Sequence, residues 1–317
     1  MSIVNSTDRE ASFRSRLGLS SMSGHMGVIV TLDGQIHPPG TPLLHADDLA
    51  AVRGDGIFET LLVRDGRACL VESHLQRLTQ SAKFMDLPGP DLPSWRHAID
   101  VAARRWAAGT ADEGAMRLIN SRGRESGTAP TAYVMVNPVP ERVTAVRRDG
   151  VAAVTLDRGL PATGVDTMPW LLAGAKTLSY AVNMAALRHA ARQGAGDVIF
   201  VSSDGLILEG PRSTVVIASD SETGADGNLC LLTPPPWYPI LRGTTQQALF
   251  EVARAKGYDC DYRALRIADL HAAQGIWLVS SMTLAARVHT LDGRRLLRSP
   301  MAAEFAELVD AAIVSDR

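Results

Sequence analysis

One lysine of this chain stands in surroundings that suit covalent chemistry. The chain has 32 basic residues, but only Lys83, Lys176 and Lys256 are lysines. Lys83 and Lys256 fall near the ends of expected helices, where a cation meets the negative end of the helix dipole. Lys176 lies in the apolar segment WLLAGAKTLSYA, just before an expected helix, where a charged ammonium group would lose its hydration. These surroundings are typical of a lysine that forms a Schiff base with a carbonyl compound.

A carboxylate follows this lysine at a spacing of 33 residues. Glu209 ends an expected strand in SSDGLILEGPRSTVVIA. Taken alone, Lys176 could snorkel at a helix start, and Glu209 could be a turn carboxylate paired with Arg212. Taken together, the two residues suit an enzyme of pyridoxal 5'-phosphate. In such an enzyme the lysine holds the cofactor, and a carboxylate keeps the pyridine nitrogen protonated.

Composition and charge exclude several other classes of protein. Hydrophobic residues make up 46% of the chain and charged residues 21%, which is typical of a globular protein and not of a disordered one. The net charge of -2 gives no basic surplus for nucleic acid or an anionic membrane. The first 25 residues lack the apolar run of a signal peptide, and no apolar run is long enough for a membrane span. Three separated cysteines (Cys69, Cys230 and Cys260) fit a reducing compartment, so we expect a cytoplasmic protein without a metal site.

The first half of the chain predicts a small α+β domain over residues 26–145. It follows a Ser- and Arg-rich segment, residues 1–25, which we expect to be a disordered extension. Two hairpins open the domain, with turns at Asp33-Gly34 and Asp65-Gly66. Apolar spacing then predicts helices over 72–87 and 94–108, and strands over 115–123 and 132–140.

The second half predicts a larger α/β domain over residues 146–317, which carries Lys176. After a strand that begins at Val151, we expect a helix over 178–193 and three short strands over 197–202, 205–210 and 213–218. A helix over 244–256 ends at Gly257, the usual residue after a helix. Further strands over 275–281 and 287–297 and a final helix over 301–314 complete the domain.

Six segments in this order resemble the fold-type IV pyridoxal phosphate enzymes, the class IV aminotransferase superfamily. They are RGDGIFETL at 53–61, HLQRL at 74–78, AKTLSYAVNMAA at 175–186, DGLILEGPRSTV at 204–215, LLTPPPWYPILRGTTQQAL at 231–249 and IADLHAAQGIWLVSSMT at 267–283. The resemblance implies the two-domain α+β fold of the D-amino acid aminotransferases, with bound pyridoxal 5'-phosphate and a small-molecule substrate. It also implies a homodimer in which RGDGIFETL lies near the partner's active site.

The resemblance implies a role for each matching position. Lys176 matches the lysine that binds the cofactor and shuttles protons, and Glu209 matches the partner of the pyridine nitrogen. Phosphate contacts are implied for Arg77, for the helix start at Thr244 and Thr245, and for Ser281, while Tyr180 is placed to reach the phenolic oxygen. Family members commonly read Pro-Gly-Ile-Thr-Arg where this chain has RGTTQ at 242–246, a change that leaves the backbone donors in place.

Substrate-side residues must separate lyase from transaminase chemistry. No Arg-x-His pair follows Arg122-Gly123, which argues against assignment as a D-amino acid transaminase. The Lys-x-Leu form of KTLSYAVN favours assignment as a lyase. We therefore expect a 4-amino-4-deoxychorismate lyase, which releases pyruvate and p-aminobenzoate for folate synthesis. Arg117, Arg122 and Arg124 are the candidates for binding substrate carboxylates. The alternatives are an aminotransferase acting on branched-chain L-amino acids or D-amino acids, and a non-catalytic binding protein of the same fold.

Overall fold

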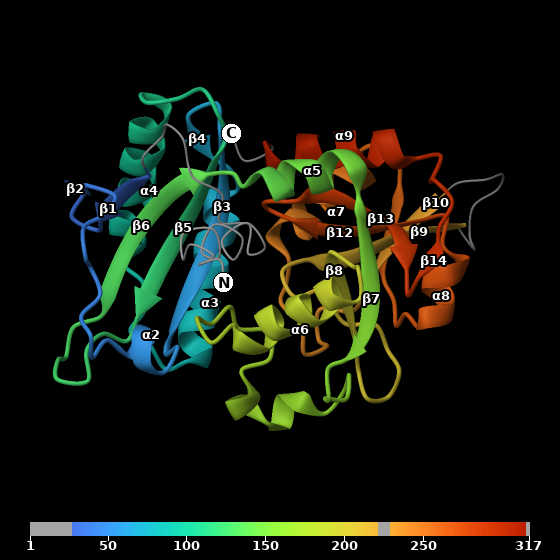
Figure 1. Ribbon diagram of the computed structural model, residues 1–317, viewed down its shortest axis with the longest axis horizontal. Helices are drawn as coiled ribbons and strands as arrows, with labels where there is room; N and C mark the ends of the chain where they lie inside the picture. Colours follow the sequence, from blue (N-terminus) through green and yellow to red (C-terminus); the bar gives the residue numbers. More distant parts are fainter. Residues whose placement is uncertain (1–26, 221–228, 315–317) are drawn as a thin grey trace, which may run out of the picture.

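Two β-sheets lie side by side in the computed structural model, which describes residues 27–220 and 229–314 (Figure 1). The first sheet is antiparallel and has the strand order β2-β1-β6-β5-β3-β4. Its strands are β1 (Val28–Thr31), β2 (Ile36–His37), β3 (Gly56–Arg64), β4 (Arg67–Ala68), β5 (Gly114–Ser121) and β6 (Thr131–Pro138). The predicted extension over residues 1–25 lies outside the described residues.

Two helices cover one face of this first sheet. They are α3 (Val71–Phe84) and α4 (Leu92–Ala107), while α2 (Leu49–Val52) is a single turn before β3. Apolar side chains at helical spacing, such as Leu75, Leu78 and Ala82, pass from α3 into a core that Trp95 and Trp106 of α4 complete. This packing fixes the orientation of α3, so the polar residues on its other side, which are described below, hold a defined position.

The second sheet is mixed and larger. Seven strands follow the order β11-β10-β9-β12-β13-β7-β8, and β14 pairs with β13. Their bounds are β7 (Val151–Asp157), β8 (Asp197–Val201), β9 (Thr214–Asp220), β10 (Leu229–Thr233), β11 (Asp259–Tyr262), β12 (Gly275–Ser280), β13 (Leu284–Leu291) and β14 (Arg294–Arg295). Helices α7 (Thr244–Ala255) and α9 (Ala302–Ile313) pack together on one side, where Phe305 stacks on Trp277 of β12. Helix α6 (Ala181–Arg192) packs against β7 and β8, and α8 (Ile267–Ala272) is a short helix before β12.

Helix α5 (Glu141–Asp149) leads from β6 of the first sheet into β7 of the second (Figure 1). The sequence did not predict this helix, and residue 145, where we place the domain boundary, lies inside it. The helix was not predicted because it has few apolar residues and buries only Val143, so no apolar spacing marks it in the sequence.

The segment that carries Lys176 pairs with β3 of the first sheet. The Phe58 N–H donates to the Lys176 carbonyl over 3.0 Å, and the Leu178 N–H donates to the Gly56 carbonyl over 2.8 Å. Gly56 is required there, because a Cβ atom at this position would lie 2.7 Å from the Asn120 carbonyl oxygen and from the Leu178 side chain. This pairing holds the lysine at the junction of the two sheets.

The structure confirms most of the predicted elements and corrects two. Both Asp-Gly hairpins form, and the helices expected over 72–87, 94–108, 244–256 and 301–314 have ends shifted by at most three residues. The helix expected over 178–193 begins only at Ala181, so Lys176 does not stand directly before a helix. The strand expected over 205–210 is wrong, since the chain there makes only isolated bridges and bends away at Gly210.

Candidate active site

Lys176 is buried, and its amine lies near two aromatic rings, one from the first sheet and one from the segment that follows the lysine. Its Nζ atom lies 4.3 Å from the ring centre of Phe58 on β3 and 5.3 Å from that of Tyr180. Burial, followed by the nearby charge of Arg77, lowers the pKa of Lys176 to about 8, although the carboxylates Glu59 and Glu209 oppose this shift. The amine is therefore much more available as a nucleophile near neutral pH than an ordinary lysine is.

The dipole of α6 contributes little to this effect. The helix begins at Ala181, and Tyr180 stands before it, so Lys176 lies more than one turn away from its start. Helix-dipole effects fall off within the first turn of a helix. Burial therefore accounts for the main part of the shift, as the apolar segment indicates.

Glu209 is a half-buried carboxylate whose charge acts on Lys176. Its Oε2 atom accepts the N–H of Leu241 over 3.0 Å. Burial raises the pKa of Glu209 to about 7, against the effects of this hydrogen bond and of Lys176. Arg212 is not its partner, because the carboxylate nearest to the Arg212 guanidinium is Asp197, at 4.0 Å. The alternative of a turn carboxylate paired with Arg212 is therefore wrong.

Tyr180 faces the same group of residues, but its hydroxyl is already engaged. The hydroxyl donates to the carbonyl of Pro211 over 2.7 Å, and the Asn183 side chain donates to the same oxygen. Burial, with the charge of Glu209, raises the pKa of Tyr180 to about 12. Tyr180 thus ties the start of α6 to the loop after Glu209, and its contact with a cofactor oxygen stays a prediction.

Arg77 belongs to a buried network that the sequence did not predict. Its guanidinium makes two hydrogen bonds to the carboxylate of Glu59, at 2.8 and 2.6 Å, and a third to the Arg242 carbonyl at 2.9 Å. The His74 Nδ1 atom lies 2.7 Å from the same Glu59 carboxylate. Burial alone would raise the pKa of Glu59, but Arg77 and His74 outweigh it and hold that pKa well below its usual range. Glu59 is therefore an anion that orients both residues.

The network continues to the start of α7. The His74 Nε2 atom lies 3.3 Å from Thr244 Oγ1 and 3.2 Å from Ser281 Oγ. Thr245 is 2% exposed, and its Oγ1 atom is buried without a hydrogen-bond partner in the described part of the chain. Gly243 stands before the helix and offers no side chain to the free backbone N–H groups. Three predicted phosphate ligands, Arg77, Thr244 and Ser281, are thus connected through His74.

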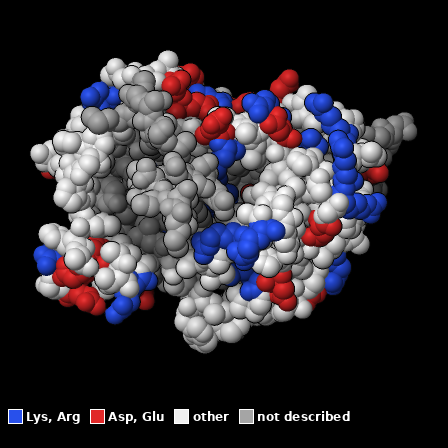
Figure 2. All heavy atoms as spheres, in the orientation of Figure 1, with Lys and Arg blue, Asp and Glu red and all other residues white. Residues whose placement is uncertain are grey.

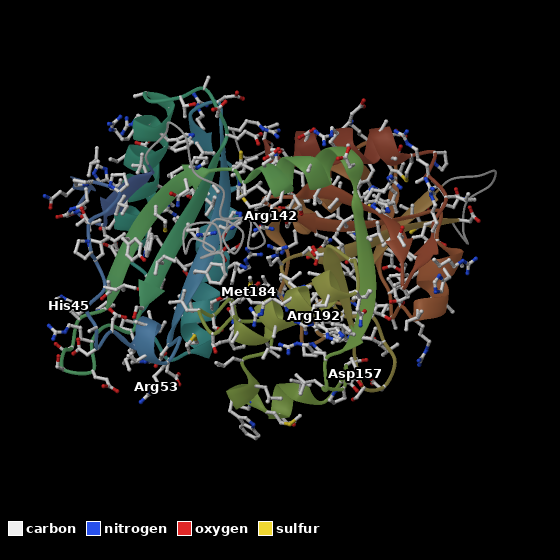
Figure 3. The ribbon with its side chains drawn as sticks, in the orientation of Figure 1. His45, Arg53, Arg142, Asp157, Met184 and Arg192 are labelled. Carbon is white, nitrogen blue, oxygen red and sulfur yellow. The ribbon has the colours of Figure 1, made fainter. Side chains whose placement is uncertain are left out.

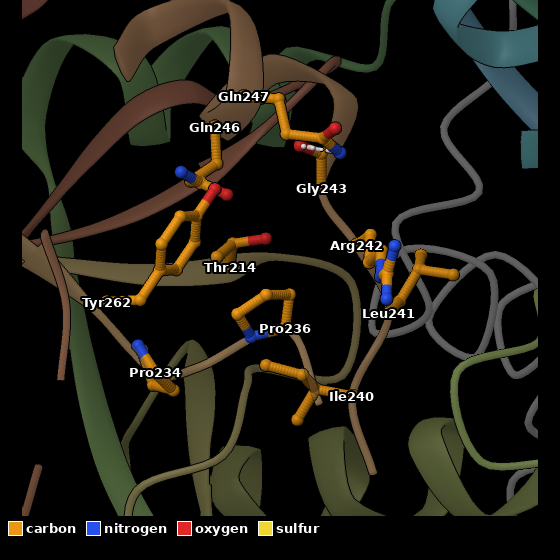
Figure 4. Close-up of a pocket in the computed structure, with 10 residues that line it drawn as sticks. All are labelled: Thr214, Pro234, Pro236, Ile240, Leu241, Arg242, Gly243, Gln246, Gln247 and Tyr262. Atoms are coloured by element: carbon orange, nitrogen blue, oxygen red, sulfur yellow. Dashed lines mark hydrogen bonds between the residues drawn. The ribbon is translucent and has the colours of Figure 1, made fainter. Parts of the chain in front are cut away.

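A small pocket of about 120 Å³ lies beside the same helix start (Figure 4). Arg242, Gly243, Gln246 and Gln247 contribute to its wall, with Tyr262 opposite. Neither Lys176 nor Glu209 lines this pocket, so the pocket lies next to the candidate active site and does not contain the lysine or the carboxylate.

The three predicted carboxylate-binding arginines have different surroundings. Arg122 is paired with Asp55 at 2.7 Å, and Arg124 is paired with Asp47 at 2.9 Å. Arg117 on β5 is exposed, and no hydrogen bond or ion pair joins it to another described residue. The first two arginines already have carboxylate partners, so Arg117 is the one most available to a ligand.

Further arginines lie near the junction of the two sheets. Figure 3 labels Arg142 of α5 there, and basic residues also show on this face in Figure 2. Burial, followed by the charge of Arg212, lowers the pKa of Arg142, and Arg117 adds to this effect. Arg212 also contributes to the lowered pKa of Lys176. The surroundings of the lysine therefore favour an anionic ligand.

Glu59 and His74 are the residues that sequence reasoning missed. Both lie within segments that carried the resemblance, RGDGIFETL and HLQRL. The signal that could have identified them is that these two short segments, which also supply other site residues, contain a carboxylate and an imidazole. Among the described residues, no group of three His, Cys, Asp or Glu side chains could hold a metal ion, and no helix is long and apolar enough to cross a membrane.

The fold and this group of residues define a known class. The family model of amino-transferase class IV matches residues 56–291, and the chain belongs to that family. The chain is 81% identical over 290 residues to the bifunctional aminodeoxychorismate lyase / D-amino acid transaminase of Mycobacterium tuberculosis, a match that covers 92% of this chain and all of the relative.

Solved structures agree with this relationship. One is described as a hypothetical aminotransferase from Mycobacterium tuberculosis in its PLP-bound form. It has a TM-score of 0.88 and 79% identity, and the match covers 92% of this chain and 100% of that chain. A fold IV-transaminase from Curtobacterium pusillum has a TM-score of 0.82 and 38% identity, over 90% of this chain and 98% of that chain. The predicted two-domain α+β fold of this superfamily is confirmed.

Proposed function

We propose that this chain is a pyridoxal phosphate-dependent 4-amino-4-deoxychorismate lyase, which releases pyruvate and p-aminobenzoate for folate synthesis. The observation that carries the enzymatic part is the buried Lys176, with a pKa of about 8, near the charges of Glu209 and Arg212. The choice of reaction is supported by the relative at 81% identity, whose name includes aminodeoxychorismate lyase. The proposal includes a cytoplasmic homodimer, as the family resemblance implies.

The residues present fit a phosphate-bearing cofactor. The buried Thr245 hydroxyl lacks a partner among the described residues, and it stands beside the uncapped N–H groups of α7. A phosphate group at this helix start would receive both kinds of donor and the favourable end of the helix dipole. Arg77 reaches the same place, because it donates to the carbonyl of Arg242, the residue before Gly243. Arg77, Thr244, Thr245 and Ser281 would hold the phosphate, and Lys176 and Glu209 would hold the ring.

Each residue then has a separate task. When bound, pyridoxal phosphate supplies an electron sink for a carbanion next to its imine carbon. Lys176 Nζ takes a proton from the substrate ring carbon, as a base whose pKa is matched to neutral pH. Glu209 holds a proton at the pyridine nitrogen, and the partly apolar surroundings of its carboxylate strengthen that interaction. Arg117 would bind a substrate carboxylate, as a guanidinium with no partner among the described residues.

A second activity, D-amino acid transamination, has a specific observation in its favour. The name of the relative at 81% identity includes D-amino acid transaminase as well as the lyase. The name of this relative is stronger support than the missing Arg-x-His pair after Gly123, which taken alone argues against a D-amino acid transaminase. Both reactions need the same base at Lys176 and differ in where the proton is returned.

A substrate comparison tests the proposed function. We expect purified protein, loaded with pyridoxal phosphate, to release p-aminobenzoate from aminodeoxychorismate and, with a 2-keto acid such as 2-oxoglutarate added as the amino acceptor, to form pyruvate from D-alanine more slowly. L-Leucine should give no keto acid above the rate of a Lys176→Ala control. Keto-acid formation from L-leucine without p-aminobenzoate release would identify a branched-chain aminotransferase instead. A chain that retains no near-ultraviolet or blue absorbance band after addition of the cofactor and removal of the unbound excess would be a binding protein.

Substitution of Arg77 should weaken cofactor binding and destabilise the protein. Arg77→Ala removes a charge-assisted interaction worth on the order of 1.5 to 3 kcal/mol, so affinity for pyridoxal phosphate should fall about ten- to a hundredfold. It also leaves the buried Glu59 carboxylate without its main partner, which costs on the order of 3 to 5 kcal/mol of unfolding free energy. Fluorescence titration measures the first effect, and urea unfolding of the cofactor-free protein measures the second.

The double variant Arg77→Met with Glu59→Gln separates the two effects. It removes both charges of the buried pair, so we expect most of the lost stability to return while cofactor affinity stays low. Recovery of affinity together with stability would show that Arg77 only supports the fold.

A further inference from the structure

The hydrogen-bond network around His74 has a defined direction. Glu59 is 0% exposed and accepts two hydrogen bonds from Arg77, so its carboxylate is ionised and cannot donate. The His74 Nδ1 atom at 2.7 Å must therefore carry a hydrogen, which it donates to Glu59. Burial, only partly opposed by Glu59, lowers the pKa of His74, so the free protein holds a neutral ring. In that ring Nε2 has a lone pair and no hydrogen.

The single lone pair of Nε2 turns the hydroxyl group that donates to it. Thr244 Oγ1 and Ser281 Oγ lie 3.3 and 3.2 Å from Nε2, and a hydroxyl satisfies an acceptor by pointing its hydrogen at it. Such a hydroxyl presents its oxygen lone pairs to the start of α7. A dianion at the uncapped helix start would then face repulsive lone pairs where it needs donors.

Protonation of His74 removes this conflict. We propose that His74 is a positioning residue that takes up one proton from solvent when a phosphate or sulfate group binds at the start of α7. Its Nε2–H then donates to the oxygen of Thr244 or Ser281, and the hydroxyl hydrogens turn to the anion. Only the N–H bond of the imidazolium ion forms, and no other covalent bond changes. The inference rests on the phosphate-binding part of the proposed function.

The charges around His74 explain why this uptake requires an anion. Glu59 on β3 favours a proton on the ring, whereas Arg77 on α3 and Lys176 disfavour it, so the ring of the free protein stays neutral until an anion offsets their charge. Thr244 and Ser281, from the second sheet's side, carry no charge. A proton on His74 therefore adds one positive charge opposite the anion, and the Glu59 carboxylate stabilises it directly.

Sulfate is the appropriate probe, because it stays a dianion and cannot react with an amine. Titrations use the full cofactor-free chain in a Lys176→Met, Glu209→Gln background, which removes the two other site groups that titrate near neutral pH. With His74 present, we expect sulfate affinity to fall by up to about tenfold per pH unit above neutrality, the limit for one coupled proton. His74→Asn keeps a donor toward Glu59 and should remove this dependence, whereas the exposed His97→Asn should retain it.

A direct observation completes the test. In protein labelled with nitrogen-15 at its 8 histidines, the His74 signal is assigned by its loss in His74→Asn. Sulfate should shift its Nε2 resonance from the unprotonated to the protonated range. An unprotonated Nε2 in the sulfate complex, equal pH dependence with and without His74, or sulfate binding unaffected by Thr245→Val would each overturn the inference. A chain that binds sulfate with proton uptake but releases no p-aminobenzoate would overturn the lyase assignment alone.

Discussion

Replacing Lys176 by alanine is expected to abolish both p-aminobenzoate release and transamination. The variant loses the amine that attaches the cofactor and the base that moves the substrate proton, and the second loss alone corresponds to about 10²- to 10⁴-fold. Borohydride reduction followed by peptide mapping should label Lys176 in the parent protein and no lysine in the variant. The exposed residues Lys83 and Lys256 provide matched controls, since their alanine variants should keep normal activity. Label on either of them would place the cofactor elsewhere.

The pH dependence of cofactor capture follows from the same environment. Only the uncharged amine attacks a carbonyl carbon, and the pKa of Lys176 is about 8 because of burial and of Arg77. The rate of attachment should therefore rise about tenfold per pH unit below pH 8 and level off above it. Stopped-flow absorbance measures this rate. A profile that still rises at pH 10 would mean that the lysine keeps an ordinary pKa.

The sequence could predict the attachment site because the relevant property is local. A lysine among apolar residues is desolvated wherever the segment packs, and the rarity of lysine in this chain removes most other candidates. The Glu59 network could not be predicted in this way, because Glu59 and His74 are joined by packing between a strand and a helix. The resemblance assigned Arg77 to phosphate but gave no reason to pair it with a buried carboxylate.

The same distinction explains the errors in the fold. The hairpin at Asp65-Gly66 was predictable because both residues adopt positive φ angles, 52° and 73°, that this dipeptide tolerates. The prediction of a strand over 205–210 was wrong because an apolar pattern indicates burial but does not show how many residues pair with a neighbouring strand. Here Ile207 and Gly210 make only isolated bridges, and Gly210 pairs with Ser213. The start of α6 was set three residues too early, since residues 176–178 pair with β3, a contact that no local pattern contains.

Glu209→Gln is expected to reduce turnover by roughly a hundredfold or more while leaving the fold and cofactor binding intact. The amide keeps the shape of the side chain and an oxygen for the Leu241 N–H at 3.0 Å, so the local structure should persist. It removes the negative charge that favours a proton on the pyridine nitrogen, a loss comparable to that of one preorganised electrostatic group. Steady-state kinetics should show a lower kcat with little change in KM.

The two reactions should respond differently to this variant. Aromatisation of the ring supplies driving force to p-aminobenzoate formation and none to transamination, so transamination depends more on the electron sink. We therefore expect the transaminase rate with D-alanine to fall further than the lyase rate. Glu209→Asp keeps the charge on a shorter side chain and should recover part of both rates. Near-normal rates in Glu209→Gln would show that the carboxylate, whose pKa burial raises to about 7, serves only to hold the turn before Leu241.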